Sequence, residues 1–144
     1  MDKKNFVIWG ILLVIMSIAC NPIPRYLEKG KDVSYNYDID TAKTGEIYIG
    51  MASYYADKFH GRQTSNGEIY NMYDLTTASP NLPFGSILRI TNLKNNRAVI
   101  VRVNDRMPPH PERIIDLSYG AAEQLDMLKD GVVKVQIEVL ELGN

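Results

Sequence analysis

Two segments of the sequence hold most of the side chains that can bind or react with a ligand. They span residues 52–70 and 103–118, and both combine aromatic, hydroxyl, amide, carboxylic and guanidinium groups. Aromatic rings pair an apolar face with a polar edge and can stack on pyranose rings. Amide, carboxylate and guanidinium groups can hydrogen-bond to sugar hydroxyls and carbonyls. The residue types therefore favour a sugar polymer as the ligand.

Asp105 is the first candidate for an acid or base. It follows the apolar stretch 98–103 and opens a loop, a position where functional groups often stand on a rigid frame. The alternative is a turn in which Asn104 and Asp105 only cap the end of a strand. Arg102 and Arg106 lie close in sequence, and a nearby cation lowers the pKa of a carboxyl. An acid at Asp105 therefore requires both guanidinium groups to point elsewhere or to bind the substrate.

Glu68 is the second candidate carboxyl, in the loop 60–71. Its alternative is a solvated loop carboxylate, which is the usual environment of glutamate. Asp116 stands between the apolar residues Ile115 and Leu117, so it is expected to be buried and hydrogen-bonded. We assign Asp116 a structural role, paired with a loop amide or an arginine.

Two consecutive tyrosines and two histidines complete the set of candidates. Tyr54 and Tyr55 end a predicted strand, so one side chain points inward and the other outward. One of them is expected in the core, and the other can serve as a platform for a sugar ring. His60 and His110 have no further ligands at suitable spacing, so no metal site is predicted. We expect His60 to be a hydrogen-bonding loop residue and His110 to be solvated.

The hydrophobic pattern predicts the elements that position these side chains. We expect strands at residues 46–55, 74–78, 87–93, 98–103, 114–117 and 133–139, and a helix at 119–128. Ser118 is the predicted N-cap of the helix, and Gly131 is its stop. Asparagines at 95–96 tolerate positive φ and fit the turn of a hairpin. Short strands without alternating helices predict a mainly β fold, a small closed β structure.

The same motifs, in this order and spacing, resemble those of the rare lipoprotein A (RlpA) family over residues 50–140. The matching pieces are Ala52-Ser53-Tyr54-Tyr55, Phe59-His60-Gly61-Arg62, Asn66-Gly67-Glu68, Leu82-Pro83-Phe84-Gly85, Arg89-Ile90-Thr91-Asn92-Leu93, Val103-Asn104-Asp105-Arg106 and Arg113-Ile114-Ile115-Asp116-Leu117-Ser118. The resemblance implies a six-stranded double-psi β-barrel with one or two short helices, related in fold to expansins, barwin and family-45 endoglucanases. It implies catalytic roles for Asp105 and Glu68. The substrate contacts it implies come from Tyr54, Tyr55, Ser79, Asn104 and Arg106.

The reaction implied by the resemblance is lytic transglycosylation of peptidoglycan glycan strands. The bond between N-acetylmuramic acid and N-acetylglucosamine is cleaved without water, and the muramyl 6-hydroxyl attacks its own anomeric carbon to leave a 1,6-anhydro end. Because the nucleophile belongs to the substrate, one carboxyl can protonate the leaving oxygen and then accept the hydroxyl proton. A hydrolase would instead need a second carboxylate. No cofactor is expected.

The sequence also departs from the family pattern. Ser79 stands where many members carry a functional histidine, and serine cannot carry charge near neutral pH. Met107 and Pro109 replace a glycine and a phenylalanine of the motif that follows Asp105. Two alternatives to the enzyme therefore stay open. One is a non-catalytic, expansin-like module that binds glycan or loosens the wall, and the other is a structural lipoprotein that tethers a partner complex to the wall.

The first residues are predicted to direct export. Lys3 and Lys4 precede an apolar run at 6–15, which is typical of a secretory signal over residues 1–19 and too short for a membrane span of ~20 residues. Cys20, at the end of the signal, is predicted to be lipidated and to hold the protein on a membrane. Ser17 departs from the usual residue of such a lipidation motif, and an unmodified thiol is the alternative.

The remaining organisation follows from composition. Residues 20–44 carry prolines and an irregular apolar pattern, so they form a predicted tether, although Tyr35 and Tyr37 could add a strand to the domain. The predicted domain spans residues 45–142. With 16 basic and 17 acidic residues, the chain lacks the basic surplus of a nucleic-acid binder. Asn21 after the cysteine favours the periplasmic face of the outer membrane over the cell membrane.

Overall fold

The computed structural model describes residues 42–144. The predicted signal (1–19), Cys20 and nearly all of the predicted tether (20–44) lie outside the described residues. Within the described range, no helix combines the length and the apolar character needed to cross a bilayer. The structure therefore bears on the predicted domain (45–142) and not on the segment that precedes it.

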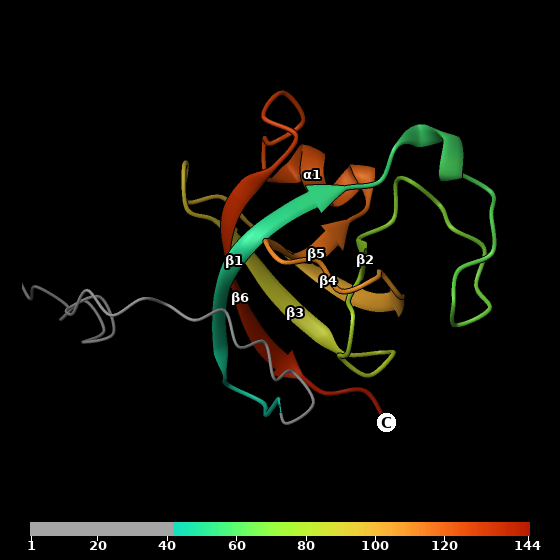
Figure 1. Ribbon diagram of the computed structural model, residues 1–144, viewed down its shortest axis with the longest axis horizontal. Coiled ribbons are helices and arrows are strands. Elements are labelled where there is room, and N and C mark those ends of the chain that lie inside the picture. Colours follow the sequence, from blue (N-terminus) through green and yellow to red (C-terminus); the bar gives the residue numbers. More distant parts are fainter. Residues whose placement is uncertain (1–41) are drawn as a thin grey trace, which may run out of the picture. The chain divides into compact units, whose positions relative to one another are not determined.

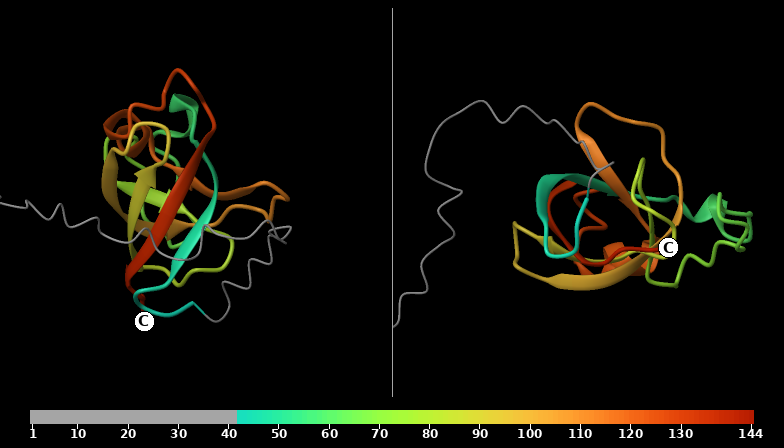
Figure 2. Two further views of the ribbon diagram at one scale, coloured as in Figure 1. Left: turned by 90° about the vertical axis from the view of Figure 1, so that its left-hand side faces the viewer. Right: turned by 90° about the horizontal axis from the view of Figure 1, so that it is seen from below.

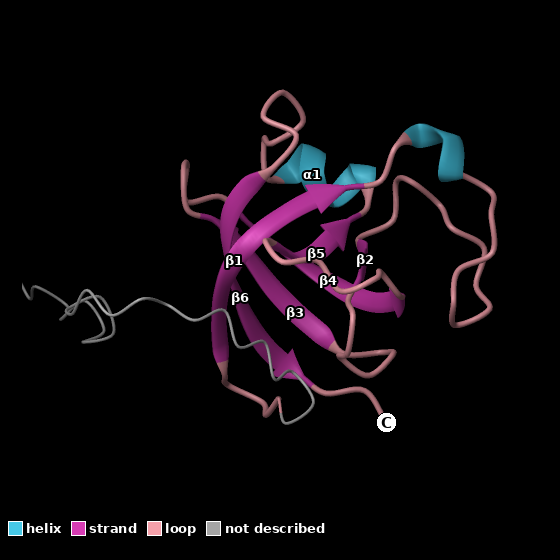
Figure 3. Ribbon diagram, in the orientation of Figure 1, coloured by secondary structure: helices cyan, strands magenta, loops and turns pink. Residues whose placement is uncertain are grey.

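Six strands close into a barrel (Figures 1 and 3). They are β1 (Ile47–Tyr54), β2 (Thr76–Ala78), β3 (Ile87–Asn92), β4 (Ala98–Asp105), β5 (Arg113–Leu117) and β6 (Val133–Glu141). Their order around the barrel is β1-β5-β2-β4-β3-β6. The pairs β1–β5 and β2–β4 are parallel, whereas the others are antiparallel. The predicted closed, six-stranded, mainly β fold is confirmed.

Alternating side chains fill the barrel. The predicted alternation of the last strand is confirmed, because Val133, Val135, Ile137 and Val139 are at most 5% exposed while Lys134 is exposed. Other fully buried side chains come from β3, β4 and β5, including Leu88, Ile90, Val101, Val103 and Ile115. Burial of this apolar surface is the main source of stability, and it fixes which side chains of each strand point outward.

The helix α1 (Tyr119–Gln124) covers one end of the barrel (Figure 1). Its predicted N-cap is confirmed, since the Ser118 hydroxyl accepts a hydrogen bond of 3.2 Å from the Ala121 amide. The predicted end at residue 128 is wrong. The Leu125 carbonyl accepts hydrogen bonds from side-chain amides of the β3–β4 hairpin, and the next residue, Asp126, has φ of 52°. These contacts turn the chain out of the helix four residues earlier than its apolar pattern indicates.

The chain between β1 and β2 stands out from one side of the barrel (Figures 1 and 2). We call residues 55–75 the excursion. It contains a short 3₁₀ helix, η3 (Asp57–Phe59), which was not predicted, and a bridge between Gln63 and Ile69. The excursion returns across the end of β4. It therefore brings the first of the two ligand-binding segments against the second.

Candidate active site

A bulge at the end of β4 aims Asp105. Thr77 of β2 pairs with Val103, but the next residue of β2, Ala78, pairs with Asp105. Asn104 is thus an extra residue on β4, and such a bulge bends a strand and redirects its side chains. Asn104 donates to the Glu68 carboxylate, whereas the carboxylate of Asp105 itself lies at a pocket.

Four hydrogen bonds hold the Asp105 carboxylate. Its Oδ1 accepts from the Ser65 amide at 2.9 Å, the Ser65 hydroxyl at 2.7 Å and the Arg106 amide at 2.8 Å. Its Oδ2 accepts from the Tyr55 hydroxyl at 2.9 Å. Burial raises the pKa of Asp105, but these donors stabilise the charged form and bring the pKa below its usual value. Burial first, and then the charge of Asp105, raise the pKa of the Tyr55 phenol far above its usual value.

Asp105 lines an aromatic pocket of about 270 Å³. The other lining residues all come from the excursion and are Tyr55, Phe59, Arg62, Gln63, Thr64 and Tyr70. The Tyr55 ring packs against Phe59 at 5.8 Å and against Tyr70 at 5.3 Å between centroids. The Arg62 guanidinium lies 5.5 Å from the centre of the Phe59 ring. A carboxylate at the wall of an aromatic pocket can bind a sugar and exchange a proton with it.

Glu68 is held as an anion. Arg102 binds both of its oxygens, at 2.7 and 2.9 Å, and the Asn104 side chain donates a further bond at 3.1 Å. Asn66 donates at 3.0 Å from within the same loop. Hydrogen bonds, first from Arg102 and then from Asn104, lower the pKa of Glu68 to about 2. At neutral pH this carboxylate attaches the excursion to β4 and has no proton to donate.

The two predicted catalytic carboxyls share one junction but not one pocket. Ser65 binds Asp105 and the adjacent Asn66 binds Glu68, while the Asn66 amide donates to the Asn104 carbonyl at 3.3 Å. Glu68 is not among the residues that line the aromatic pocket. Asp105 is therefore the carboxyl that a ligand in this pocket would meet.

Arg106 points away from the Asp105 carboxylate. Its guanidinium donates to the Leu82 carbonyl at 2.8 Å and to the Ser79 carbonyl at 3.4 Å, and it stacks on Phe84 at 3.9 Å. Arg102 is bound to Glu68. Neither guanidinium group therefore binds the Asp105 carboxylate, as an acid at this position requires. The pKa of Asp105 is lowered by the neutral donors of Ser65, Tyr55 and the Arg106 backbone rather than by the two guanidinium groups.

The family model described as "Lytic transglycolase" matches residues 47–137. The chain belongs to the RlpA family. A Campylobacter jejuni protein named endolytic peptidoglycan transglycosylase RlpA is 54% identical over 100 residues, covering 69% of this chain and 36% of that protein. A Pasteurella multocida protein of the same name is 44% identical over 143 residues, covering 97% and 47%. The chain thus spans less than half the length of these relatives.

Solved structures support the same RlpA fold. A Streptomyces papain inhibitor is 25% identical with a TM-score of 0.56, covering 66% of this chain and 94% of that protein. The apo expansin of Clavibacter michiganensis is 16% identical with a TM-score of 0.56, covering 69% of this chain and 52% of that protein. At this identity the similarity indicates a shared fold only. The barrel is a double-psi β-barrel, as the resemblance implied.

The other predicted contact residues of this RlpA barrel lie outside the aromatic pocket. Tyr54 donates to the Leu128 carbonyl at 3.0 Å and packs edge-on against Tyr119. Ser79 is 1% exposed, and its hydroxyl accepts from the Leu82 amide at 3.2 Å. Asn104 is 4% exposed, and its side-chain amide donates to the Glu68 carboxylate. Of the predicted substrate contacts, only Tyr55 lines the pocket.

Two residues that line the pocket and one that binds Asp105 from outside it were not singled out from the sequence. Ser65, Phe59 and Tyr70 all fall within the 52–70 segment, but nothing in the sequence distinguishes them from their polar and aromatic neighbours. The available signal was the turn at Asn66-Gly67, where Gly67 has φ of 92°. Such a turn fixes the backbone of the preceding residues, and it presents Ser65 to the end of β4.

The remaining titratable groups have structural contacts. Asp116 is buried and accepts hydrogen bonds from the Ser53 hydroxyl and, at 3.0 Å, from Arg113, which confirms its predicted structural role. His60 accepts from the Met72 amide at 3.1 Å, as expected for a hydrogen-bonding loop residue, and His110 is exposed. Among residues 42–144 no group of His, Cys, Asp and Glu side chains could hold a metal ion.

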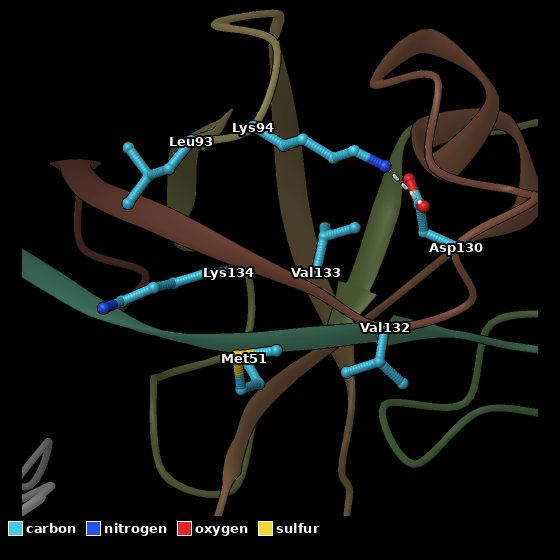
Figure 4. A pocket seen from close by; sticks show the side chains of 7 residues that line it. All are labelled: Met51, Leu93, Lys94, Asp130, Val132, Val133 and Lys134. Atoms are coloured by element: carbon cyan, nitrogen blue, oxygen red, sulfur yellow. Dashed lines mark hydrogen bonds and ion pairs between the residues drawn. The ribbon is translucent and has the colours of Figure 1, made fainter.

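Another pocket lies on the barrel wall, where β1 and β6 meet the β3–β4 hairpin (Figure 4). Its volume is about 430 Å³, and its lining residues are Met51, Leu93, Lys94, Asp130, Val132, Val133 and Lys134. The side chains are mainly apolar, and the Lys94 amine pairs with Asp130 at 2.7 Å. No predicted catalytic or substrate-binding residue lines it, so the smaller aromatic pocket is the candidate active site of this RlpA domain.

Proposed function

We propose that this barrel is the catalytic domain of a lytic transglycosylase that cleaves peptidoglycan glycan strands between N-acetylmuramic acid and N-acetylglucosamine. The observation that carries the proposal is a single carboxyl, Asp105, at the wall of an aromatic pocket. Membership of the RlpA family supports it, since the relatives are named endolytic peptidoglycan transglycosylases. One carboxyl is sufficient for this reaction because the substrate provides its own nucleophile.

In the proposed reaction, Asp105 acts first as an acid and then as a base. The protonated carboxyl gives its proton to the glycosidic oxygen as the bond from the muramyl anomeric carbon to that oxygen breaks. The muramyl 6-hydroxyl oxygen bonds to the anomeric carbon, and the Asp105 carboxylate takes the hydroxyl proton. The products are a 1,6-anhydro end and a free sugar hydroxyl, and the carboxyl regains its starting proton.

The low pKa of Asp105 in the free protein leaves it ionised, so substrate binding must favour the protonated form. A glycan in the pocket would exclude water and strengthen the burial that already acts to raise this pKa. In this scheme Tyr55 and Phe59 bind sugar rings and the buried Tyr70 supports the Tyr55 ring, while Glu68 keeps the excursion attached to β4. The proposal therefore gives the catalytic step to Asp105 and a positioning role to Glu68.

A second candidate function is an expansin-like module that binds glycan without cleaving it. Ser79 favours it, because this residue replaces the histidine of many family members and its side chain is buried within a turn. The Ser79 hydroxyl cannot take up the charge that a histidine would carry. This candidate predicts binding in the same aromatic pocket but no new chain ends.

The deciding experiment uses purified glycan strands that lack stem peptides. After incubation with the full chain, mass spectrometry should detect new 1,6-anhydro ends, and Asp105→Asn should abolish them. Asp130→Asn makes the same chemical change in the distant wall pocket and should leave the rate unchanged. Binding of the strands without new ends would support the expansin-like module instead.

We also propose that the chain is exported and anchored by a lipid on Cys20, on the periplasmic face of the outer membrane or on the cell membrane. The support is the basic and apolar pattern of residues 1–19 and the position of the cysteine. Cys20→Ala should move the protein from the membrane to the soluble fraction and abolish metabolic labelling with palmitate. Unchanged fractionation and labelling would contradict the anchor.

A further inference from the structure

We propose that Ser65 is a positioning residue, which saturates Oδ1 of Asp105 and leaves Oδ2 as the oxygen that exchanges the proton with the substrate. The inference rests on the proposed function, because it assigns one atom of the carboxyl to the proposed proton transfer. Nothing in the sequence motifs distinguishes the two oxygens. The distinction comes from the unequal distribution of donors around the carboxylate.

The donors around Asp105 are divided three to one. The amide and the hydroxyl of Ser65 and the amide of Arg106 all donate to Oδ1, at 2.9, 2.7 and 2.8 Å. A carboxylate oxygen offers about two lone-pair sites, so three donors leave Oδ1 no free site. Oδ2 accepts only from Tyr55 among the described residues. A proton on Oδ1 would face three other protons, whereas Oδ2 has a free site.

The side of the carboxyl that carries Oδ2 also belongs to the pocket. Tyr55, which donates to Oδ2, lines the pocket together with Asp105, whereas Ser65 does not. The Tyr55 phenol stays neutral because burial raises its pKa. It can therefore donate to an ionised Oδ2 and rotate to accept from a protonated one. The proton that Asp105 exchanges with the substrate therefore moves to and from Oδ2, on the side of the carboxyl where a sugar in the pocket would lie.

Ser65 is itself held in place through Glu68. The Thr64 amide donates to the Glu68 carbonyl at 2.7 Å, and the Gly67 amide donates to the Thr64 carbonyl at 3.0 Å, which closes a tight turn around Ser65. Arg102 binds the Glu68 carboxylate at the base of this turn. The ion pair thus fixes the turn, and the turn fixes the two donors of Ser65 on Oδ1.

Other polar groups near Asp105 do not replace this contact. Arg62 and Tyr70 line the pocket from the excursion, and the Arg106 guanidinium is directed at the Leu82 carbonyl. The hydroxyl of Ser65 is the one donor to Oδ1 that a side-chain substitution can remove. Because Ser65 is exposed, its replacement should leave the fold intact.

The test compares Ser65→Ala with Ser65→Thr, which keeps a hydroxyl, in the full chain. Carbon-13 NMR of the aspartate carboxyls measures the pKa of Asp105 without any glycan. Ser65→Ala should raise that pKa, because a donor to the charged form is lost. The alkaline limb of the pH profile should move upward with that pKa. On the plateau below this limb kcat should fall about tenfold with KM little changed, because the carboxyl is no longer held with Oδ2 towards the sugar. Ser65→Thr should restore both properties.

Two results would overturn the inference: an unchanged pKa of Asp105 in Ser65→Ala, or a threonine variant as impaired as the alanine variant. The NMR titration also separates this inference from the proposed function. If the wild-type chain produced no anhydro ends, the proposed transglycosylase would fail and with it the proton transfer from Oδ2. The titration would still establish whether Ser65 holds Oδ1.

Discussion

Replacement of Glu68 by glutamine tests whether this residue is an acid or a structural anion. The pKa of Glu68 falls from 4.5 to about 2, which corresponds to roughly 3 kcal/mol at ~1.4 kcal/mol per pKa unit. The side chain is 41% exposed, so solvent screening reduces this figure. We expect Glu68→Gln to lower the free energy of unfolding by about 1–2 kcal/mol at pH 7.

The pH dependence of this loss has a definite sign. Because the folded-state pKa is lowered, the stabilisation is complete above about 4.5 and is lost as the pH falls towards about 2. Glutamine does not titrate. The difference in stability between wild type and Glu68→Gln should therefore be largest at neutral pH and should shrink between pH 4.5 and 2. Urea unfolding of both proteins at a series of fixed pH values measures this difference.

The matched control is Glu138→Gln on the outside of β6. Glu138 makes a single bond of 2.9 Å with Arg89, whose side chain is 48% exposed, so its replacement should cost less than about 0.5 kcal/mol. Equal losses in the two variants at pH 7, or a Glu68→Gln difference that stays constant down to pH 2, would refute the reasoning. A catalytic acid at Glu68 would show the opposite pattern, with activity lost and stability kept.

Three further variants test other contacts. Gly120→Ala would place a Cβ 2.6 Å from the Tyr73 carbonyl oxygen, so thermal unfolding should show a loss of about 1–3 kcal/mol. Arg113→Met leaves the buried Asp116 carboxylate without its cation and should cost about 1.5–3 kcal/mol in urea; a loss below that of Arg89→Met at the surface would contradict this. Asp105→Asn should abolish new anhydro ends and lower the melting temperature while unfolding stays cooperative, because a charged acceptor of four hydrogen bonds is lost; product formation at the wild-type rate would exclude Asp105 as the acid.

Most of the barrel could be predicted from the sequence because its strands are half-buried and alternate. The alternating valines and isoleucine at 133, 135, 137 and 139 identify both β6 and its inward face. The end of α1 could not be predicted, because the hydrogen bonds to the Leu125 carbonyl come from Asn92 and Asn95, about thirty residues earlier. The hydrophobic pattern of a helix depends on nearby residues only and does not indicate partners so far away in the sequence.

The candidate site shows the same division between local and distant information. The motifs placed Asp105 and Tyr55 at element ends, and the structure joins them at 2.9 Å across fifty residues. The pairing of Glu68 with Arg102 spans thirty-four residues, and nothing in either motif indicates that the arginine neutralises this carboxyl rather than Asp105. Likewise, Ser79 reads as a substitution at a functional position, but only the tertiary structure shows that its hydroxyl is enclosed in a turn.

The bulge at Asn104 means that chain length, as well as residue identity, encodes the site. The extra residue sets Ala78 opposite Asp105, where Asp105 faces the aromatic pocket, while Asn104 donates to the Glu68 carboxylate of the ion pair. Deletion of Asn104 would move Asp105 up by one position on β4 and turn its side chain to the opposite face of the strand, even with every other amino acid retained. A design that places this site in another barrel must therefore include the bulge between β2 and β4. Substitutions in a strand without the extra residue would not reproduce it.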